Sequence, residues 1–304
     1  MVSTGAPLAV RLDPDDPAAS ALHARVLAGL PRSFRPVPAD GRTRADVVLV
    51  SGAGTTWAER AQSAFDGGAK GVMLTAIDAW HPETRWGCSA PPKTGSACAP
   101  PETCAALHRI RPPAGVATVI DSAWAAHPAV LDATAPIAAD LAAITFITGA
   151  FTVPPRAGPS GRLAVEHLAL VRVVAAPVVD VRVLAAGDGG YELVGTAGQV
   201  PVHLSATVSA AGTERGELCL LGADRQWSLA FGGTALAIPP RVFRAAAGGE
   251  TVRPAVYECA QRAAWRAMHA AVTAAPVPRY GLACLRADVA ALTAAPAATA
   301  SPPR

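Results

Sequence analysis

The side chains best suited to acid–base chemistry lie at two places in the chain. Glu166 and His167 are adjacent in "GRLAVEHLALVRVV", and Asp78 and His81 lie close together in "VMLTAIDAWHP". Histidine titrates near neutral pH, and a carboxyl group does so when its surroundings raise its pKa. Structural interpretations compete with catalysis. Asp78 suits a turn cap, His167 suits a buried hydrogen-bonded position, and adjacent helical residues such as Glu166 and His167 do not face each other.

The opening stretch predicts a strand, a tight turn and a helix, which often begin a nucleotide-binding domain. "LAVRL" reads as the strand, and the helix runs from about residue 17 to residue 30. A phosphate-binding turn needs glycines, so that backbone N–H groups can approach a pyrophosphate. This turn, "DPDDPAAS", has no glycine and holds Asp13, Asp15 and Asp16. We interpret Asp16 as the helix N-cap and Pro17 as the first helical residue.

Strands and helices alternate through the first half of the chain. The predicted strands are "LAVRL", "ADVVLVS", "KGVMLTAI" and "VATVIDS", with a further short strand in "FRPV". Helices are expected in "TTWAERAQSAFDGG" and "PPETCAALHRI", on either side of a long loop from residue 80 to residue 101. Short apolar strands that alternate with helices are typical of a parallel, doubly wound sheet. Loops of this length are often functional or disordered.

The second half is dominated by strands whose polar and apolar residues alternate. Strands are predicted in "AAITFITGAF", "VVDVRVL", "YELVGT", "VPVHLSATVSA", "GELCLLG" and "QWSLAFG". Ser205, Thr207 and Ser209 should lie on a polar sheet face, and Trp227 on the apolar face. A later helix should carry Tyr257 and Trp265 at helical spacing. We predict a reduced Rossmann-like domain over 1–122, a mainly antiparallel open-sheet domain with flanking helices over 123–293, and a disordered tail over 294–304.

Composition excludes several classes of protein. The 304 residues carry a net charge of +3 with scattered basic residues, which argues against a nucleic-acid partner. No apolar run reaches about 18 residues and no signal peptide is evident, so we expect no membrane association and a cytoplasmic location. The six cysteines form no C-x-x-C pair, which favours free thiols over a zinc site, and no metal is predicted.

This layout resembles the Gfo/Idh/MocA oxidoreductase family over most of the chain. "ADVVLVSGAGTTWAERAQSAFDGGAKGVML" is similar to that family's fourth strand, nicotinamide loop, helix and fifth strand. "PPETCAALHRIRPPAGVATVIDSAWAAHPAV" is similar to the helix, strand and crossing segment that follow. "GRLAVEHLALVRVV" resembles the helix that carries the family's active-site histidine. Within the family, the "HPAV" segment and the sheet layout most resemble the thiazolinyl imine reductases.

Three departures from the family weaken the expected nucleotide site. The first is the acidic turn. The second is a deletion, because only "PRSFRPVPADGRTRA" separates the first helix from "DVVLV", where the family has a strand, a helix and the strand-end acidic residue that holds the ribose. Asp40 could substitute, although "ADG" also suits a turn. The third is the missing Glu-Lys-Pro motif, whose place is taken by Ala76, Ile77 and Asp78.

The resemblance implies roles for individual residues. His167 matches the catalytic histidine, although its flanking residues differ, and Asp78 or His81 could replace the missing lysine in acid–base work. His127 and Trp124 fall where the chain crosses the cleft, so they are predicted to bind substrate. Alternatively, His127 caps the segment that leads to Pro128, and Trp124 belongs to the core. Arg172, on the helix of His167, could bind an anionic substrate or lie exposed.

Three functions remain open at this stage. The first is a divergent family member that lacks an ordinary dinucleotide site and binds a small organic metabolite of specialised metabolism between its domains, as a non-redox enzyme or as the partner of an active homologue. The second is an NAD(P)H-dependent reductase of a carbonyl or imine. The third is a scaffold protein that uses the polar sheet face. No cofactor is predicted under the first, and a homodimer or a heterodimer with a homologue is expected.

Overall fold

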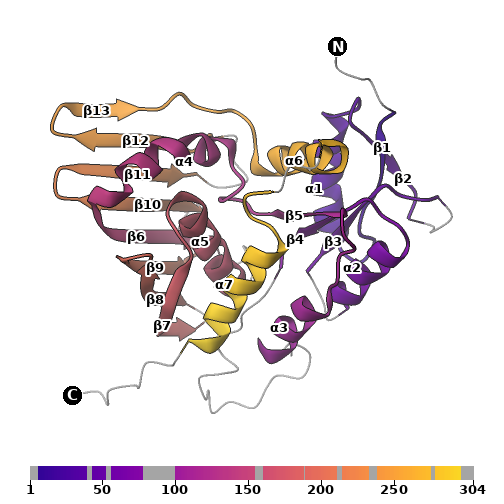
Figure 1. Ribbon diagram of the computed structural model, residues 1–304, viewed down its shortest axis with the longest axis horizontal. Helices are drawn as coiled ribbons and strands as arrows, with labels where there is room; N and C mark the ends of the chain where they lie inside the picture. Colours follow the sequence, from indigo (N-terminus) through magenta and orange to yellow (C-terminus); the bar gives the residue numbers. More distant parts are fainter. Residues whose placement is uncertain are drawn as a thin grey trace.

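The computed structural model is built from two β-sheets with helices packed against them (Figure 1). It describes residues 6–39, 43–52, 56–77, 100–154, 160–187, 189–210, 214–232, 238–274 and 278–295.

Sheet A contains five parallel strands in the order β2-β1-β3-β4-β5. The strands are β1 (Leu8–Arg11), β2 (Phe34–Val37), β3 (Val47–Ser51), β4 (Gly71–Thr75) and β5 (Ala117–Asp121). Every residue of β3 and β4 is buried, as their continuous apolar sequences predict for strands covered on both faces. The predicted short strand "FRPV" is β2, which pairs with β1 at the edge of the sheet.

Helices cover both faces of sheet A. On one face lie α2 (Trp57–Asp66) and α3 (Pro100–Arg109), and on the other lie α1 (Pro17–Ala28) and α6 (Ala260–Ala274) (Figure 1). Although α6 comes from the C-terminal part of the chain, it packs against α1, β4 and β5. Its Trp265 is fully buried and joins Leu27, Phe34 and Met73 in one apolar cluster. The helix begins at Ala260, so the prediction that Tyr257 belongs to it is wrong; that side chain precedes the helix and is 83% exposed.

Sheet B contains eight strands in the order β13-β12-β11-β10-β6-β9-β8-β7. Neighbouring strands are antiparallel except for β6 and β9, which are parallel. The strands are β6 (Ile144–Val153), β7 (Val178–Gly187), β8 (Gly190–Ala197), β9 (Val200–Val208), β10 (Arg215–Gly222), β11 (Arg225–Phe231), β12 (Arg241–Ala246) and β13 (Gly249–Val252). This mostly antiparallel sheet after a parallel one confirms the predicted fold class.

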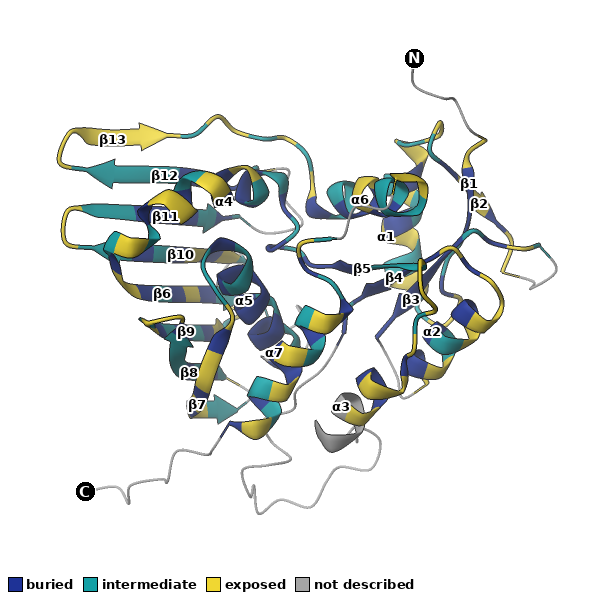
Figure 2. Ribbon diagram, in the orientation of Figure 1, coloured by how far each residue is buried: buried dark blue, intermediate teal, exposed yellow. Residues whose placement is uncertain are grey.

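Within the described residues, the helices that pack on sheet B all cover the same face. The helices α4 (Pro128–Asp140), α5 (Ser160–Val174) and α7 (Leu282–Ala294) all lie on one side of the sheet (Figure 1). Leu204, Ala206 and Trp227 are buried, whereas Thr207 is exposed (Figure 2). The predicted alternation is therefore present, and no helix of the described ranges packs on the polar face.

A single apolar core runs from the α2 side of sheet A into the helix-covered face of sheet B. It joins Val50 and Leu74 of sheet A to Leu168 of α5 and Leu204 of sheet B. Helix α7 contributes to this junction, because it packs against α3, α5, β5 and β7. The carboxyl ends of β4 and β5 are therefore held against α5 and α7. None of the helices in the described residues has the length and apolarity needed to cross a membrane.

Candidate functional site

The crevice between β1 and β3 is the place where a doubly wound sheet usually binds a nucleotide. The chain runs from β1 to β2 on one side and continues with β3 on the other side, so the strand order reverses here. Asp13 follows β1 in this crevice and is only 2% exposed. Its Oδ2 accepts a hydrogen bond from the backbone N–H of Ser51 at 2.7 Å and pairs with Nη2 of Arg60 at 3.1 Å. Its Oδ1 accepts the N–H of Asp15 at 3.0 Å.

Asp16 is the N-cap of α1 and Pro17 is the first helical residue, as predicted. The Asp16 carboxylate accepts the N–H of Ala19 at 2.9 Å and the hydroxyl of Ser51 at 2.6 Å. Burial raises the pKa of Asp16, but its hydrogen bonds with Ala19, Ser51 and Ala18 and the nearby charge of Arg162 together hold that pKa below its usual value. The N-terminus of α1 is thus already capped by a carboxylate of the chain, and these residues do not fit a bound pyrophosphate.

A pocket of about 350 Å³ lies beside this crevice. Arg11 and Asp13 line it from the end of β1, Ala39 from the segment after β2, and Glu59 and Arg60 from α2. Arg60 also pairs with Asp15 at 2.9 Å, so the pocket wall holds carboxylates and arginines side by side. This is where a dinucleotide's adenosine would lie in a doubly wound sheet.

The carboxyl ends of β4 and β5 carry a network of buried polar groups. Asp121 accepts the hydroxyl of Thr75 at 2.9 Å, and its Oδ2 lies 3.4 Å from Nε2 of His23 on α1. Nδ1 of His23 in turn accepts the indole N–H of Trp265 at 3.0 Å. The other carboxylate oxygen of Asp121 is buried with no hydrogen-bond partner in the described residues.

Glu166, rather than His167, projects from α5 toward these strand ends. The Ser122 hydroxyl donates to Glu166 at 2.5 Å, and the N–H of Ala123 donates to it at 3.3 Å. Burial raises the pKa of the Glu166 carboxyl above its ordinary value. Glu166 and Asp121 line a cavity of about 20 Å³, which has room for roughly one water molecule. The Glu166 carboxyl is therefore placed to exchange a proton only with a very small molecule.

His167 points in another direction, into the apolar core under sheet B. It is 0% exposed, and its Nδ1 lies 2.5 Å from the hydroxyl of Tyr191. Its ring contacts Phe151 and Trp124, with centroids 4.2 Å and 5.4 Å away. Burial lowers the pKa of His167 to about 3, so the ring is neutral near pH 7. It lines neither of the two pockets above nor the pocket described next, and its catalytic role stays a prediction.

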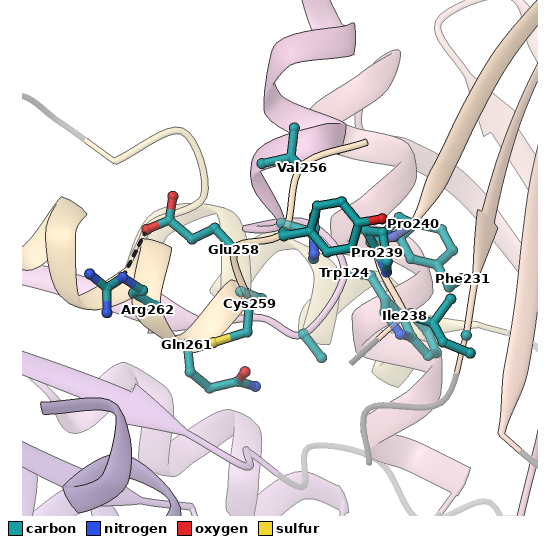
Figure 3. A pocket seen from close by; sticks show the side chains of 15 residues that line it. Trp124, Phe231, Ile238, Pro239, Pro240, Val256, Glu258, Cys259, Gln261 and Arg262 are labelled. Atoms are coloured by element: carbon teal, nitrogen blue, oxygen red, sulfur yellow. Dashed lines mark ion pairs between the residues drawn. The ribbon is translucent and has the colours of Figure 1, made fainter. Parts of the chain in front are cut away.

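A pocket of about 450 Å³ brings together two of the residues predicted to bind substrate, Trp124 and His127. It lies where the segment after β5 meets the end of β11, the segment before β12 and the start of α6 (Figure 3). Trp124 is 3% exposed and forms part of the wall. His127 caps α4, with its Nδ1 accepting the N–H of Ala129 at 3.2 Å, and burial lowers its pKa to about 4. Contact with a substrate stays a prediction for both.

Of the remaining predicted substrate-binding residues, Arg172 does not line this pocket. Arg172 forms an ion pair with the buried Asp288 of α7, which engages its guanidinium within the protein. Asp78, His81 and Asp40 lie outside the described residues. Among the described residues, no group of three or more histidine, cysteine or acidic side chains could hold a metal ion.

Several pocket residues were not predicted from the sequence. They are Phe231, Ile238, Pro239, Pro240, Val256, Glu258 and Gln261. They come from the end of β11, the segments before β12 and α6, and the first turn of α6. No sequence motif joins these segments. The one available indication was Tyr257, a large aromatic residue that proves to lie outside the helix assigned to it.

No family model and no curated protein matches this sequence. Solved structures do match, at low identity and over almost the whole chain. UDP-N-acetylglucosamine 3-dehydrogenase GnnA from Acidithiobacillus ferrooxidans is 14% identical with a TM-score of 0.66, over 94% of this chain and 95% of that one. KijD10, a 3-ketoreductase from Actinomadura kijaniata in complex with NADP, is 16% identical with a TM-score of 0.63, over 95% and 96%.

GenD2 from gentamicin A biosynthesis, in complex with NAD, is 15% identical with a TM-score of 0.62, over 96% of this chain and 94% of that one. At such identities the likeness concerns the fold. The chain therefore shares the two-sheet fold of these solved structures.

Proposed function

We propose that this chain binds a small organic molecule between its two sheets without a nicotinamide dinucleotide, as a non-redox enzyme or as the partner of an active homologue. The observation that carries the proposal is the buried carboxylate of Asp13 in the crevice between β1 and β3.

A dinucleotide would have to bring its pyrophosphate to the N-terminus of α1. There it would meet Asp13 and Asp16, whose oxygens already accept the local N–H and hydroxyl donors. Displacing Asp13 would also leave the Arg60 guanidinium without that partner. A displaced Asp13 would also lose the N–H donors of Asp15 and Ser51, and hydrogen bonds to a charged group contribute about 1.5 to 3 kcal/mol each, which opposes dinucleotide binding.

The proposed ligand site is the pocket lined by Trp124 and His127. Its volume of about 450 Å³ falls within the range of small-molecule sites, roughly 300 to 1,000 Å³. It also lies between elements that pack on different sheets, since α6 covers sheet A and β11 belongs to sheet B. Pockets between packed units are frequent ligand sites.

A second candidate is an NAD(P)H-dependent reductase of a carbonyl or imine. One observation favours it, the pocket of about 350 Å³ beside Asp13, which has two arginines in its wall. The NADP and NAD in the KijD10 and GenD2 structures are consistent with this candidate.

Calorimetric titration of the purified protein with NADH, NADPH and ADP separates the two candidates. ADP carries the pyrophosphate and adenosine without the nicotinamide, so it probes the smaller pocket alone. We expect no saturable heat with any of the three at micromolar concentrations. A dissociation constant in the low micromolar range for NADH or NADPH would overturn the proposal and support the reductase.

A further inference from the structure

We infer that the pocket of Trp124 and His127 takes an uncharged, flat and largely apolar molecule that accepts one hydrogen bond from Nε2 of His127. This inference names the ligand class of the proposed small-molecule site and rests on that proposal. It differs from the sugar nucleotide that the name of GnnA indicates, which carries a charged diphosphate.

The walls of the pocket are mostly aromatic and aliphatic. Trp124 and Phe231 are buried, with ring centroids 6.2 Å apart, and the exposed residues Ile238 and Tyr257 also line the pocket. Figure 3 shows Pro239, Pro240, Phe231 and Ile238 at one end of the pocket. Aromatic and proline faces offer flat apolar surfaces, so a planar ring system would bury the most apolar area here.

The charged groups of the pocket are already paired. The Glu258 carboxylate lies 3.5 Å from Nε of Arg262 and 3.1 Å from Nη1 of Arg266. Arg262 also donates to the carbonyl of Gly29 at 3.1 Å. In Figure 3, Glu258 and Arg262 lie at the end of the pocket opposite to Phe231. A charged ligand would therefore have to compete with these internal partners while it loses its own hydration.

His127 supplies a hydrogen-bond donor in the wall of the pocket. Its Nδ1 accepts the N–H of Ala129, and the ring is neutral near pH 7 because burial lowers its pKa. A neutral imidazole with an accepting Nδ1 carries its proton on Nε2. Within the described part of the chain, no residue accepts a hydrogen bond from that Nε2, and His127 lines the pocket. The complementary ligand group is an oxygen acceptor such as a carbonyl.

The probe that tests this chemistry is 6-propionyl-2-dimethylaminonaphthalene, a flat, uncharged fluorophore with one ketone. Two comparison compounds are 2-dimethylaminonaphthalene, which lacks the carbonyl, and 6-dimethylamino-2-naphthoate, which is an anion. We expect saturable one-site binding of the ketone, detected by its blue-shifted emission. The carbonyl-free compound should bind about tenfold more weakly, since one net hydrogen bond contributes about 1.4 kcal/mol. The naphthoate should also bind more weakly, because its carboxylate would lose its hydration in a largely apolar pocket.

Two variants locate the probe. Ile238→Glu places a carboxylate in the pocket wall and should abolish binding, whereas Val252→Glu should leave binding unchanged. Ile238 and Val252 are both 55% exposed, but Val252 lies on β13 outside the pocket, so the two substitutions are matched.

His127→Asn keeps an N-cap residue and removes the Nε2 donor. It should weaken the ketone about tenfold and leave the carbonyl-free compound unaffected.

Three results would overturn the inference: no saturable binding of the ketone, equal binding by the Ile238 and Val252 variants, or an equal loss of both uncharged compounds in His127→Asn. These readouts do not involve a dinucleotide. Tight NADH binding would therefore contradict the proposed function without changing them, and a failed probe titration would remove only the ligand class.

Discussion

The backbone N–H of Ser51, at the end of β3, donates to the buried carboxylate of Asp13 after β1 across 2.7 Å. This contact bridges the two strands at which the order of sheet A reverses. In dinucleotide-binding proteins that crevice is left open by glycines, and a helix N-terminus faces the pyrophosphate. Here a side chain of the protein supplies the negative charge, so the acidic turn stabilises the fold where related folds bind a ligand.

Asp13→Asn should destabilise the protein by about 2 kcal/mol, because it removes the charge from a buried group that accepts three hydrogen bonds. Asp15→Asn is the matched control. Asp15 also pairs with Arg60, but its side chain is 56% exposed, so the loss should be about 0.5 kcal/mol. Urea unfolding followed by circular dichroism measures both. Equal losses for the two variants would contradict the structural role of Asp13.

The buried histidines should make the protein less stable as the pH falls below about 6.5. The folded pKa is lowered by burial to about 3 for His167 and to about 4 for His127. Between these values and 6.5, the unfolded chain binds protons that the folded chain does not. Stability is therefore lost as the pH decreases through this window, by up to about 1.4 kcal/mol per pH unit for each histidine.

His167→Gln should reduce that slope by about 1.4 kcal/mol per pH unit between pH 6 and pH 4.5, since glutamine does not titrate and can still hydrogen-bond Tyr191. The free energy of unfolding in urea at several pH values measures the slope. An NMR titration of the His167 ring near pH 6.5 in the folded protein would contradict the prediction, and an unchanged slope in the variant would do the same.

We expect a second copy of the chain, or a homologue, to cover the polar face of sheet B. Thr148 of β6 pairs with His203 of β9 near the middle of this face, and Phe146 is 37% exposed. Thr148→Arg should yield monomers, because it places a charge where two flat faces would meet. Glu250→Arg, on the exposed edge strand β13, is the control. Light scattering tests assembly, both for the protein expressed alone and for the protein co-expressed with homologues. A monomeric wild-type protein in both samples would contradict the expected assembly.

Much of the fold was predictable from local patterns. The continuous apolar stretch of β3 indicated a strand buried on both faces, and the alternation around Leu204 and Thr207 indicated a sheet with one polar face. Asp16 and Pro17 marked the start of α1. These features depend on residues within a few positions of one another, so a single sequence carries them. The same patterns did not reveal α7, because its alanines make the exposed face apolar as well and obscure the buried stripe of Leu282, Leu285, Val289 and Leu292.

Tertiary packing decided which side chains form the site. Glu166 and His167 are neighbours in the sequence, but helical geometry turns them about 100° apart, and the packing of α5 between the sheets directs Glu166 to Ser122 and His167 to Tyr191. The pocket of Trp124 likewise depends on α6 returning to sheet A from more than a hundred residues away. The sequence by itself determined the strands from β1 to β11, the cap of α1 and the acidic turn, but not β12 and β13. The burial of Asp13 and the pocket walls follow from contacts between distant segments, which local periodicity does not encode.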